Sequence, residues 1–126
     1  MLGMRHVALR VRDIEKSLDF YSRVLGMQVE WRPDPRNAYL TSGNDNLALH
    51  EAEDPAQLAV GPATSLDHFG FFVSRPEQVD EWARRLETRG VPLVQQPKTH
   101  RDGARSIYFR DPDGNLLQLL HHPNAK

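Results

Sequence analysis

The first residues that could do chemistry are two histidines, His6 and His68, which lie half a chain length apart. A neutral imidazole binds transition metals, and it also accepts a proton near neutral pH. The two residues lie 62 positions apart in a chain of 126 residues, and each comes just before or at the start of a segment rich in apolar residues. The pair is therefore a candidate for metal binding. The alternative is that each histidine is an ordinary hydrogen-bonded residue of its strand.

The alternation of apolar and polar residues indicates which face of its strand each of these polar side chains occupies. Val7, Leu9 and Val11 alternate with His6, and successive side chains of a strand point to opposite faces. Likewise His68 alternates with the apolar residues at 69, 71 and 73, and Gln118 alternates with the leucines at 117 and 119. The three polar side chains are therefore expected on the faces opposite the apolar ones.

His50 is a further candidate, either as a metal ligand or as a general base. The alternative is that His50 has no role in the site and simply contacts solvent near the end of its strand. Glu51 has the opposite parity and is expected on the other face. The sequence contains no cysteine, which excludes disulfides, thiolate metal sites and a cysteine nucleophile.

The elements that carry these residues repeat in the two halves of the chain. The first half predicts a strand at 5–11, a helix at 14–25 ended by Gly26, and strands at 27–31, 38–41 and 46–50. The second half predicts a strand at 68–73, a helix beginning at Pro76 and ending near Gly90, and strands at 91–95, 105–109 and 116–121.

This order predicts an α+β fold of two βαβββ modules. The offset between equivalent positions is 62 residues at the first strand and the start of the helix, and 64 residues between Gly26 and Gly90. A ferredoxin-like βαββαβ sandwich is the alternative, but it has fewer strands. We expect a single domain over 1–126, with module one at about 4–51, a connector at 52–65 and module two at about 66–122.

The segments Arg5–Asp13, Val24–Met27 and Tyr108–Asn115, the last containing Asp-Pro-Asp-Gly-Asn, carry a resemblance to a known family. The chain resembles the vicinal oxygen chelate superfamily, which includes glyoxalase I, bleomycin-resistance proteins, fosfomycin-resistance enzymes and extradiol dioxygenases. The resemblance implies a cupped, barrel-like mixed sheet with helices outside and a ligand in the concave interior. It also implies a homodimer.

Carried over by position, the superfamily's metal ligands would be His6, Ala48, His68 and Gln118. Ala48 supplies no ligand, and Gln118 stands where most members have a glutamate, so affinity for a divalent ion should fall. His50 could complete the set. We expect a divalent ion (Zn, Ni, Fe or Mn) and no organic cofactor. Without carboxylates at 48 and 118, ordinary glyoxalase I activity is not expected.

Four further residues are predicted to bind the substrate: Arg10, Phe72, Tyr108 and Arg105. Arg10 shares the parity of His6, and an arginine there would suit a carboxylate or phosphate. Its alternative is a place at the wet end of the strand. Phe72 and Tyr108 could instead belong to the core. Arg105 ends a polar segment at 99–105 that is either a loop over the ligand or a solvated loop.

Composition limits the partners. Sixteen basic and seventeen acidic residues give a net charge of −1, which predicts no general attraction to nucleic acid or to an anionic membrane. No apolar run approaches a membrane span, so a cytoplasmic protein is expected.

The leading function is a metal-dependent glyoxalase/dioxygenase-like enzyme acting on a small oxygen-bearing molecule. The alternative is a metal-free binding or sequestration protein of the bleomycin-resistance type.

Overall fold

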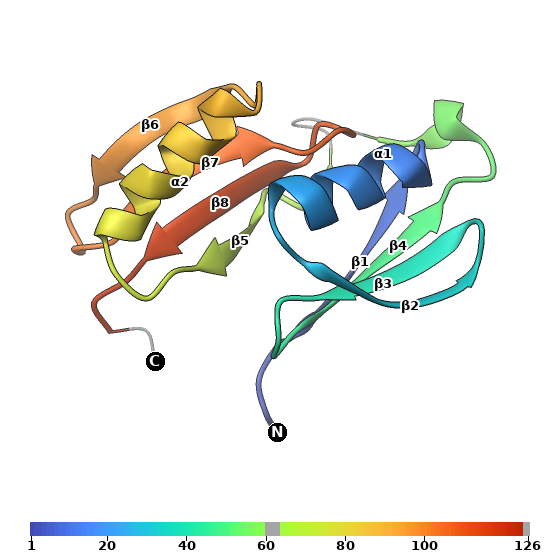
Figure 1. Ribbon diagram of the computed structural model, residues 1–126, viewed down its shortest axis with the longest axis horizontal. Helices are drawn as coiled ribbons and strands as arrows, with labels where there is room; N and C mark the ends of the chain where they lie inside the picture. Colours follow the sequence, from blue (N-terminus) through green and yellow to red (C-terminus); the bar gives the residue numbers. More distant parts are fainter. Residues whose placement is uncertain (60–63, 125–126) are drawn as a thin grey trace. The chain divides into compact units, whose positions relative to one another are not determined.

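The chain divides into two compact units, Met1–Ala59 and Val60–Lys126. The computed structural model describes residues 1–59 and 64–124, so positions 60–63 of the predicted connector lie outside the described residues. In each unit a helix lies across one face of a four-stranded sheet (Figure 1).

The first unit has the order strand, helix, strand, strand, strand. Its elements are β1 (His6–Val11), α1 (Ile14–Leu18), the π-helical segment η1 (Asp19–Val24), β2 (Gln28–Asp34), β3 (Asn37–Thr41), β4 (Asn46–Glu51) and the short 3-10 helix η2 (Pro55–Gln57). The sheet order is β1-β4-β3-β2. Only the β1–β4 pair is parallel, so the sheet is mixed.

Local signals explain where the first helix begins and ends. The Asp13 carboxylate accepts hydrogen bonds from the backbone N–H groups of Glu15 at 3.0 Å and Lys16 at 3.2 Å. This satisfies donors that have no partner within the helix. Gly26 follows with a φ of +83°, a conformation that glycine adopts without steric cost. The predicted helix is present, but its second half winds as the π-helical η1.

The second unit repeats this order. Its elements are β5 (Phe69–Phe72), α2 (Glu77–Thr88), β6 (Leu93–Thr99), β7 (Arg105–Arg110) and β8 (Leu116–His121). The sheet order is β5-β8-β7-β6, again with one parallel pair, β5–β8. The prediction of an α+β fold with two βαβββ modules is confirmed, although β5 begins one residue after His68. The barrel-like cup formed by both modules stays a prediction.

The cores lie between each sheet and its own helix. In the first unit, Val11 and Leu49 are fully buried and pack on the side of Ile14 and Tyr21. In the second, Ile107, Phe109 and Leu117 are buried on the α2 side with Val79 and Leu86. Burying alternate residues on one face leaves the other residues of each strand on the opposite face. We call this opposite face the open face of each sheet.

Among the described residues, no helix is both long enough and apolar enough to cross a membrane.

Candidate functional site

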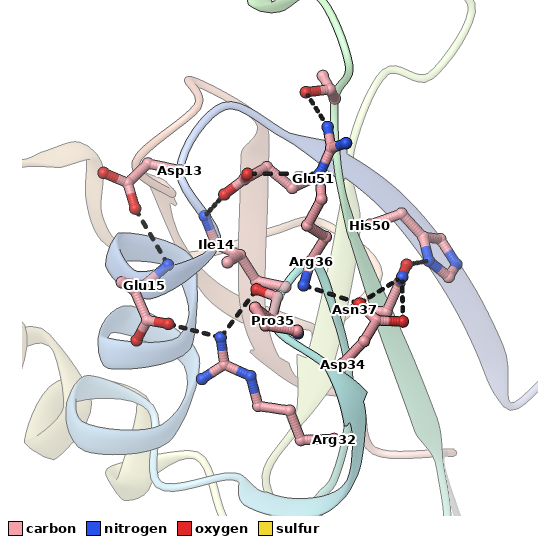
Figure 2. Close-up of polar contacts among 11 residues, drawn as sticks. Asp13, Ile14, Glu15, Arg32, Asp34, Pro35, Arg36, Asn37, His50 and Glu51 are labelled. Atoms are coloured by element: carbon pink, nitrogen blue, oxygen red, sulfur yellow. Dashed lines mark hydrogen bonds and ion pairs between the residues drawn. The ribbon is translucent and has the colours of Figure 1, made fainter.

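The open face of the first sheet carries three of the predicted site residues, His6, Arg10 and His50. Strands β1 and β4 place His6 beside Asn46, Ala8 beside Ala48, and Arg10 beside His50. The two alanines leave β1 and β4 without bulky side chains between the two histidines, and Tyr39 on β3 pairs with Ala48 on the same face. Glu51 lies on the helix side, as alternation predicts, where its Oε2 accepts from the backbone N–H of Ile14 at 3.1 Å (Figure 2).

His50 is held by a row of polar side chains. Its Nδ1 lies 2.6 Å from Asn37 Oδ1, and Asn37 is its partner across the β3–β4 pair. The Asn37 amide Nδ2 donates to both carboxylate oxygens of Asp34, at 2.9 and 3.0 Å (Figure 2). The edge of the His50 ring also meets Tyr39, with centroids 6.0 Å apart. The imidazole is thus fixed from two sides.

His6 has an equivalent set of partners. Its Nδ1 lies 2.7 Å from Asn46 Oδ1, and Asn46 Nδ2 donates to Glu30 Oε2 at 3.3 Å. The two histidines of this face therefore repeat one pattern, in which a carboxylate of β2 holds an asparagine and the asparagine meets the imidazole.

The register separates these two histidines. His6 pairs with Asn46, four residues before His50 on β4, which corresponds to roughly 13 Å along the strand. Two imidazole nitrogens on one ion lie within about 4.2 Å of each other, given metal–nitrogen bonds of about 2.1 Å. Each ring also meets an asparagine on a neighbouring strand, His6 with Asn46 and His50 with Asn37. This spacing argues against one ion held by both.

In the second unit the open face gathers Gln118 and Tyr108. The register places Gln118 between Gly70 on β5 and Tyr108 on β7. His68 contacts the Tyr108 ring edge-on, with centroids 5.3 Å apart, and its Nδ1 lies 2.6 Å from Asp67 Oδ1. The structure therefore brings His68 and Gln118 to the same neighbourhood through Tyr108.

Phe72 shares this open face, since it pairs with Leu120, and it is 63% exposed. A large aromatic ring exposed to this degree beside polar residues suits contact with the apolar part of a ligand.

A pocket of about 740 Å³ lies beside Gln118. Its lining residues are Lys98, Thr99, His100, Arg101, Asp102, Ala104, Tyr108, Gln118, Leu120 and His122. Lysine, arginine and two histidines outnumber the one acid, which favours an anionic ligand. The acid has partners of its own: the backbone N–H of Ala104 lowers the pKa of the Asp102 carboxyl, and His122 lowers it further.

A second pocket, of about 650 Å³, lies on the first unit. It is lined by Arg10, Asn37 and His50 together with residues 51–54 and 57–59. Arg10 and His50 are register partners at this end of the sheet, so a donor and an imidazole face the same space.

Arg105 lies elsewhere. Its side chain is on the helix side of the second sheet, where Nε and Nη2 donate to the two carboxylate oxygens of Asp80 on α2, at 2.8 and 2.7 Å. This pair raises the pKa of Arg105 and lowers that of Asp80. Nη1 donates to Thr99 at 3.0 Å. Arg105 does not line the pocket beside Gln118, where a substrate contact was predicted for it, so the proposed site does not include Arg105.

Comparison with known proteins identifies the family. Residues 3–119 match the model of the Glyoxalase/Bleomycin resistance protein/Dioxygenase superfamily. The chain belongs to this superfamily.

Among the superfamily's curated members, the chain is 37% identical over 118 residues to the glutathione transferase FosA of Serratia marcescens, covering 93% of this chain and 79% of the relative. It is 31% identical over 117 residues to the metallothiol transferase FosB of Staphylococcus saprophyticus, covering 93% and 75%.

Solved structures share the fold. An integron cassette protein from the mobile metagenome of a Halifax Harbour sewage outfall aligns with a TM-score of 0.79 and 27% identity, over 96% of this chain and 99% of that one. A lactoylglutathione lyase from Agrobacterium tumefaciens aligns with a TM-score of 0.76 at 24% identity, over 94% and 92%, which supports the fold alone.

The predicted ligands His6, His68 and Gln118 have atoms of the types that bind divalent metals, but they carry no negative charge. Two imidazoles and an amide oxygen can coordinate a transition metal, yet none of them brings a negative charge. Within the described residues no group of three histidine, cysteine, aspartate or glutamate side chains comes together to hold an ion. Of the three predicted ligands, His6 lies in the first unit, and His68 and Gln118 lie in the second.

The residues of the site that were absent from the sequence-based prediction include Asn37, Asn46 and Lys98. Asn37 and Asn46 have the parity of the open face, which is a signal that the sequence does contain. What it lacks is the pairing of β3 with β4 and of β1 with β4, which brings each asparagine beside its histidine.

Proposed function

We propose that this protein is a metal-dependent enzyme that acts on a small, oxygen-bearing anion. The observation that carries the proposal is the state of His6 and His68. Each has its Nδ1 against an oxygen atom, of Asn46 and Asp67 respectively, which leaves Nε2 as the ligating nitrogen. Histidines that bind metals usually hold their other ring nitrogen in this way.

In this proposal His6, His68 and Gln118 hold the ion, which is Zn, Ni, Fe or Mn. When bound, the ion supplies a Lewis acid that polarises a substrate oxygen. Because the three ligands are neutral, the bound ion keeps its full positive charge, which favours an anionic substrate over a neutral one. No organic cofactor is needed for this chemistry.

The reaction we propose is the transfer of a thiol to the substrate. This rests on the 37% and 31% identical relatives, whose names are glutathione transferase and metallothiol transferase. In such a transfer the sulfur forms a bond to a carbon, a carbon–oxygen bond of the substrate breaks, and the thiol proton ends on the released oxygen. All atoms come from the two reactants.

The two pockets have distinct roles. The pocket beside Gln118 holds the anion, with Lys98 and Arg101 supplying positive charge, while Tyr108 and Phe72 contact the rest of the molecule. The pocket of the first unit holds the second reactant. There Arg10 binds a carboxylate, and His50 acts as hydrogen-bond acceptor or general base. We keep the homodimer and the cytoplasmic location as predictions.

The test is elemental analysis of protein purified without a histidine tag. We expect close to one divalent ion per chain, and we expect His6→Ala and His68→Ala each to lose it. His121→Ala is the matched control, since His121 pairs with Arg105 on the helix side of the second sheet, and it should keep the ion.

A protein that stays metal-free after dialysis against each of the four ions would contradict the proposal. Retention of ligand binding by that metal-free protein, with no change in the ligand, would favour the alternative function of binding and sequestration.

A further inference from the structure

Two asparagines on the first sheet occupy the same chemical position toward two histidines. Asn37 lies between Asp34 and His50, and Asn46 lies between Glu30 and His6. In both cases the amide nitrogen faces a carboxylate and the amide oxygen faces an imidazole nitrogen. The first of these rows is drawn in Figure 2.

The carboxylate decides which way each amide points. A carboxylate only accepts hydrogen bonds, so the group facing it must be the donor NH₂. Asp34 meets this condition twice, at 2.9 and 3.0 Å, and the Asn37 amide together with the backbone N–H of Arg36 lowers the pKa of its carboxyl. The amide oxygen is then left facing the histidine.

The amide oxygen in turn decides the tautomer of the histidine. A carbonyl oxygen only accepts, so the ring nitrogen 2.6 Å from Asn37 Oδ1 and the one 2.7 Å from Asn46 Oδ1 must each carry the proton. In the neutral imidazole the lone pair then lies on Nε2.

We propose that Asn37 and Asn46 are positioning residues that lock His50 and His6 in the tautomer protonated at Nδ1. Each histidine then presents the lone pair of Nε2 on the open face. This assignment of separate tasks rests on the proposed function. His6 Nε2 coordinates the ion, and His50 Nε2 accepts a hydrogen bond from a hydroxyl, thiol or ammonium group of the ligand beside Arg10.

The decisive experiment measures the tautomers in metal-free protein. Long-range ¹H–¹⁵N correlation spectra of ¹⁵N-histidine-labelled chain, recorded well above the ordinary histidine pKa of about 6.5, distinguish the two neutral tautomers. Signals are assigned with His6→Gln and His50→Gln. We expect both histidines of the wild type to show a single tautomer, protonated at Nδ1.

Each asparagine provides the control for the other. Asn37→Ala should convert His50 to a mixture of tautomers and leave His6 unchanged, and Asn46→Ala should do the reverse. A wild-type spectrum with either histidine mixed or protonated at Nε2 overturns the proposal without any variant. An unchanged His50 signal in folded Asn37→Ala overturns it for that pair.

A second measurement ties the tautomers to their tasks. Metal titration should show about tenfold or greater loss of affinity in Asn46→Ala, the range usual for residues that orient a metal-binding histidine, and no loss in Asn37→Ala. Failure of the proposed metal site would leave the tautomer pattern of the metal-free protein intact, so the two failures are distinguishable. Equal loss in both asparagine variants would contradict the separate tasks.

Discussion

The ion pair between Arg105 and Asp80 gives a direct test of the role of Arg105. Two charge-assisted hydrogen bonds, at 2.8 and 2.7 Å, join the guanidinium to both carboxylate oxygens. The perturbation we choose is Arg105→Met, which keeps an unbranched side chain and removes the charge. Asp80→Ala and the double variant complete a double-mutant cycle.

The magnitude follows from geometry and exposure. The side chains are 26% and 35% exposed, so solvent screens the pair in part. Exposed pairs contribute up to about 1 kcal/mol, and paired bidentate geometry favours the upper end of that range. We therefore expect a coupling of about 1 kcal/mol. For a chain of this size each kcal/mol lowers Tm by about 4 °C.

The assay is urea unfolding followed by circular dichroism, with the cycle isolating the pair from other effects. The cycle is needed because Asp80 also lies in the first turn of α2, where a negative charge interacts with the helix dipole. A coupling below about 0.3 kcal/mol would refute the reasoning. Loss of ligand binding by Arg105→Met, at a temperature where it is fully folded, would return Arg105 to the site.

Four further outcomes are expected. Arg105 lowers the pKa of Asp80 in the folded protein, so the stability from this pair is present above the unfolded pKa of about 3.9 and is lost as the pH falls from there through the lower folded pKa. The stability of Asp80→Asn should therefore fall less than that of the wild type over this acid range. The same pH dependence of stability in both proteins would contradict this prediction. Gly70→Ala should destabilise by about 1–3 kcal/mol in urea unfolding, since its Cβ would lie 2.7 Å from the backbone oxygen of Gln118; a neutral result would show that β5 shifts freely. Gln118→Glu should tighten divalent-metal binding in titration because it adds charge, and equal or weaker affinity would place Gln118 away from the ion. Mixing His6→Ala with His68→Ala chains should restore part of the metal binding if sites form between the chains of a homodimer, whereas sites within one chain would give no rescue.

Alternation made the faces of the strands predictable, because the side-chain period of a strand is fixed at two. The parity of Val7, Leu9 and Val11 alone places His6 on the open face, and the same reasoning places Gln118. The order of elements followed from the repeat of the two halves. The π-helical η1 could not be foreseen, since the apolar spacing at 14–25 fits an ordinary helix equally well.

Arg105 shows that parity is informative only where it is applied. The predicted strand at 105–109 begins at the same residue as β7, so Arg105 already had the parity of Ile107 and Phe109, which indicates the helix side. The expected substrate contact treated Arg105 as the end of a polar loop and did not use that parity. Its partner Asp80 is 25 residues earlier on α2, and nothing local in the sequence connects them.

His6 and His50 mark the point where parity stops being informative. Both have the parity of the open face, so both are candidates for one metal site when the sequence is considered alone. Strand pairing determines what parity does not, namely where along the sheet each histidine lies. Once β1 pairs with β4 in parallel so that His6 meets Asn46, His50 lies four residues further along, beside Arg10. One face with two separate imidazoles, each with its own asparagine and carboxylate, suits two different tasks better than one shared ion: coordination at the His6 end, and recognition of a hydrogen-bond donor beside a carboxylate at the His50 end.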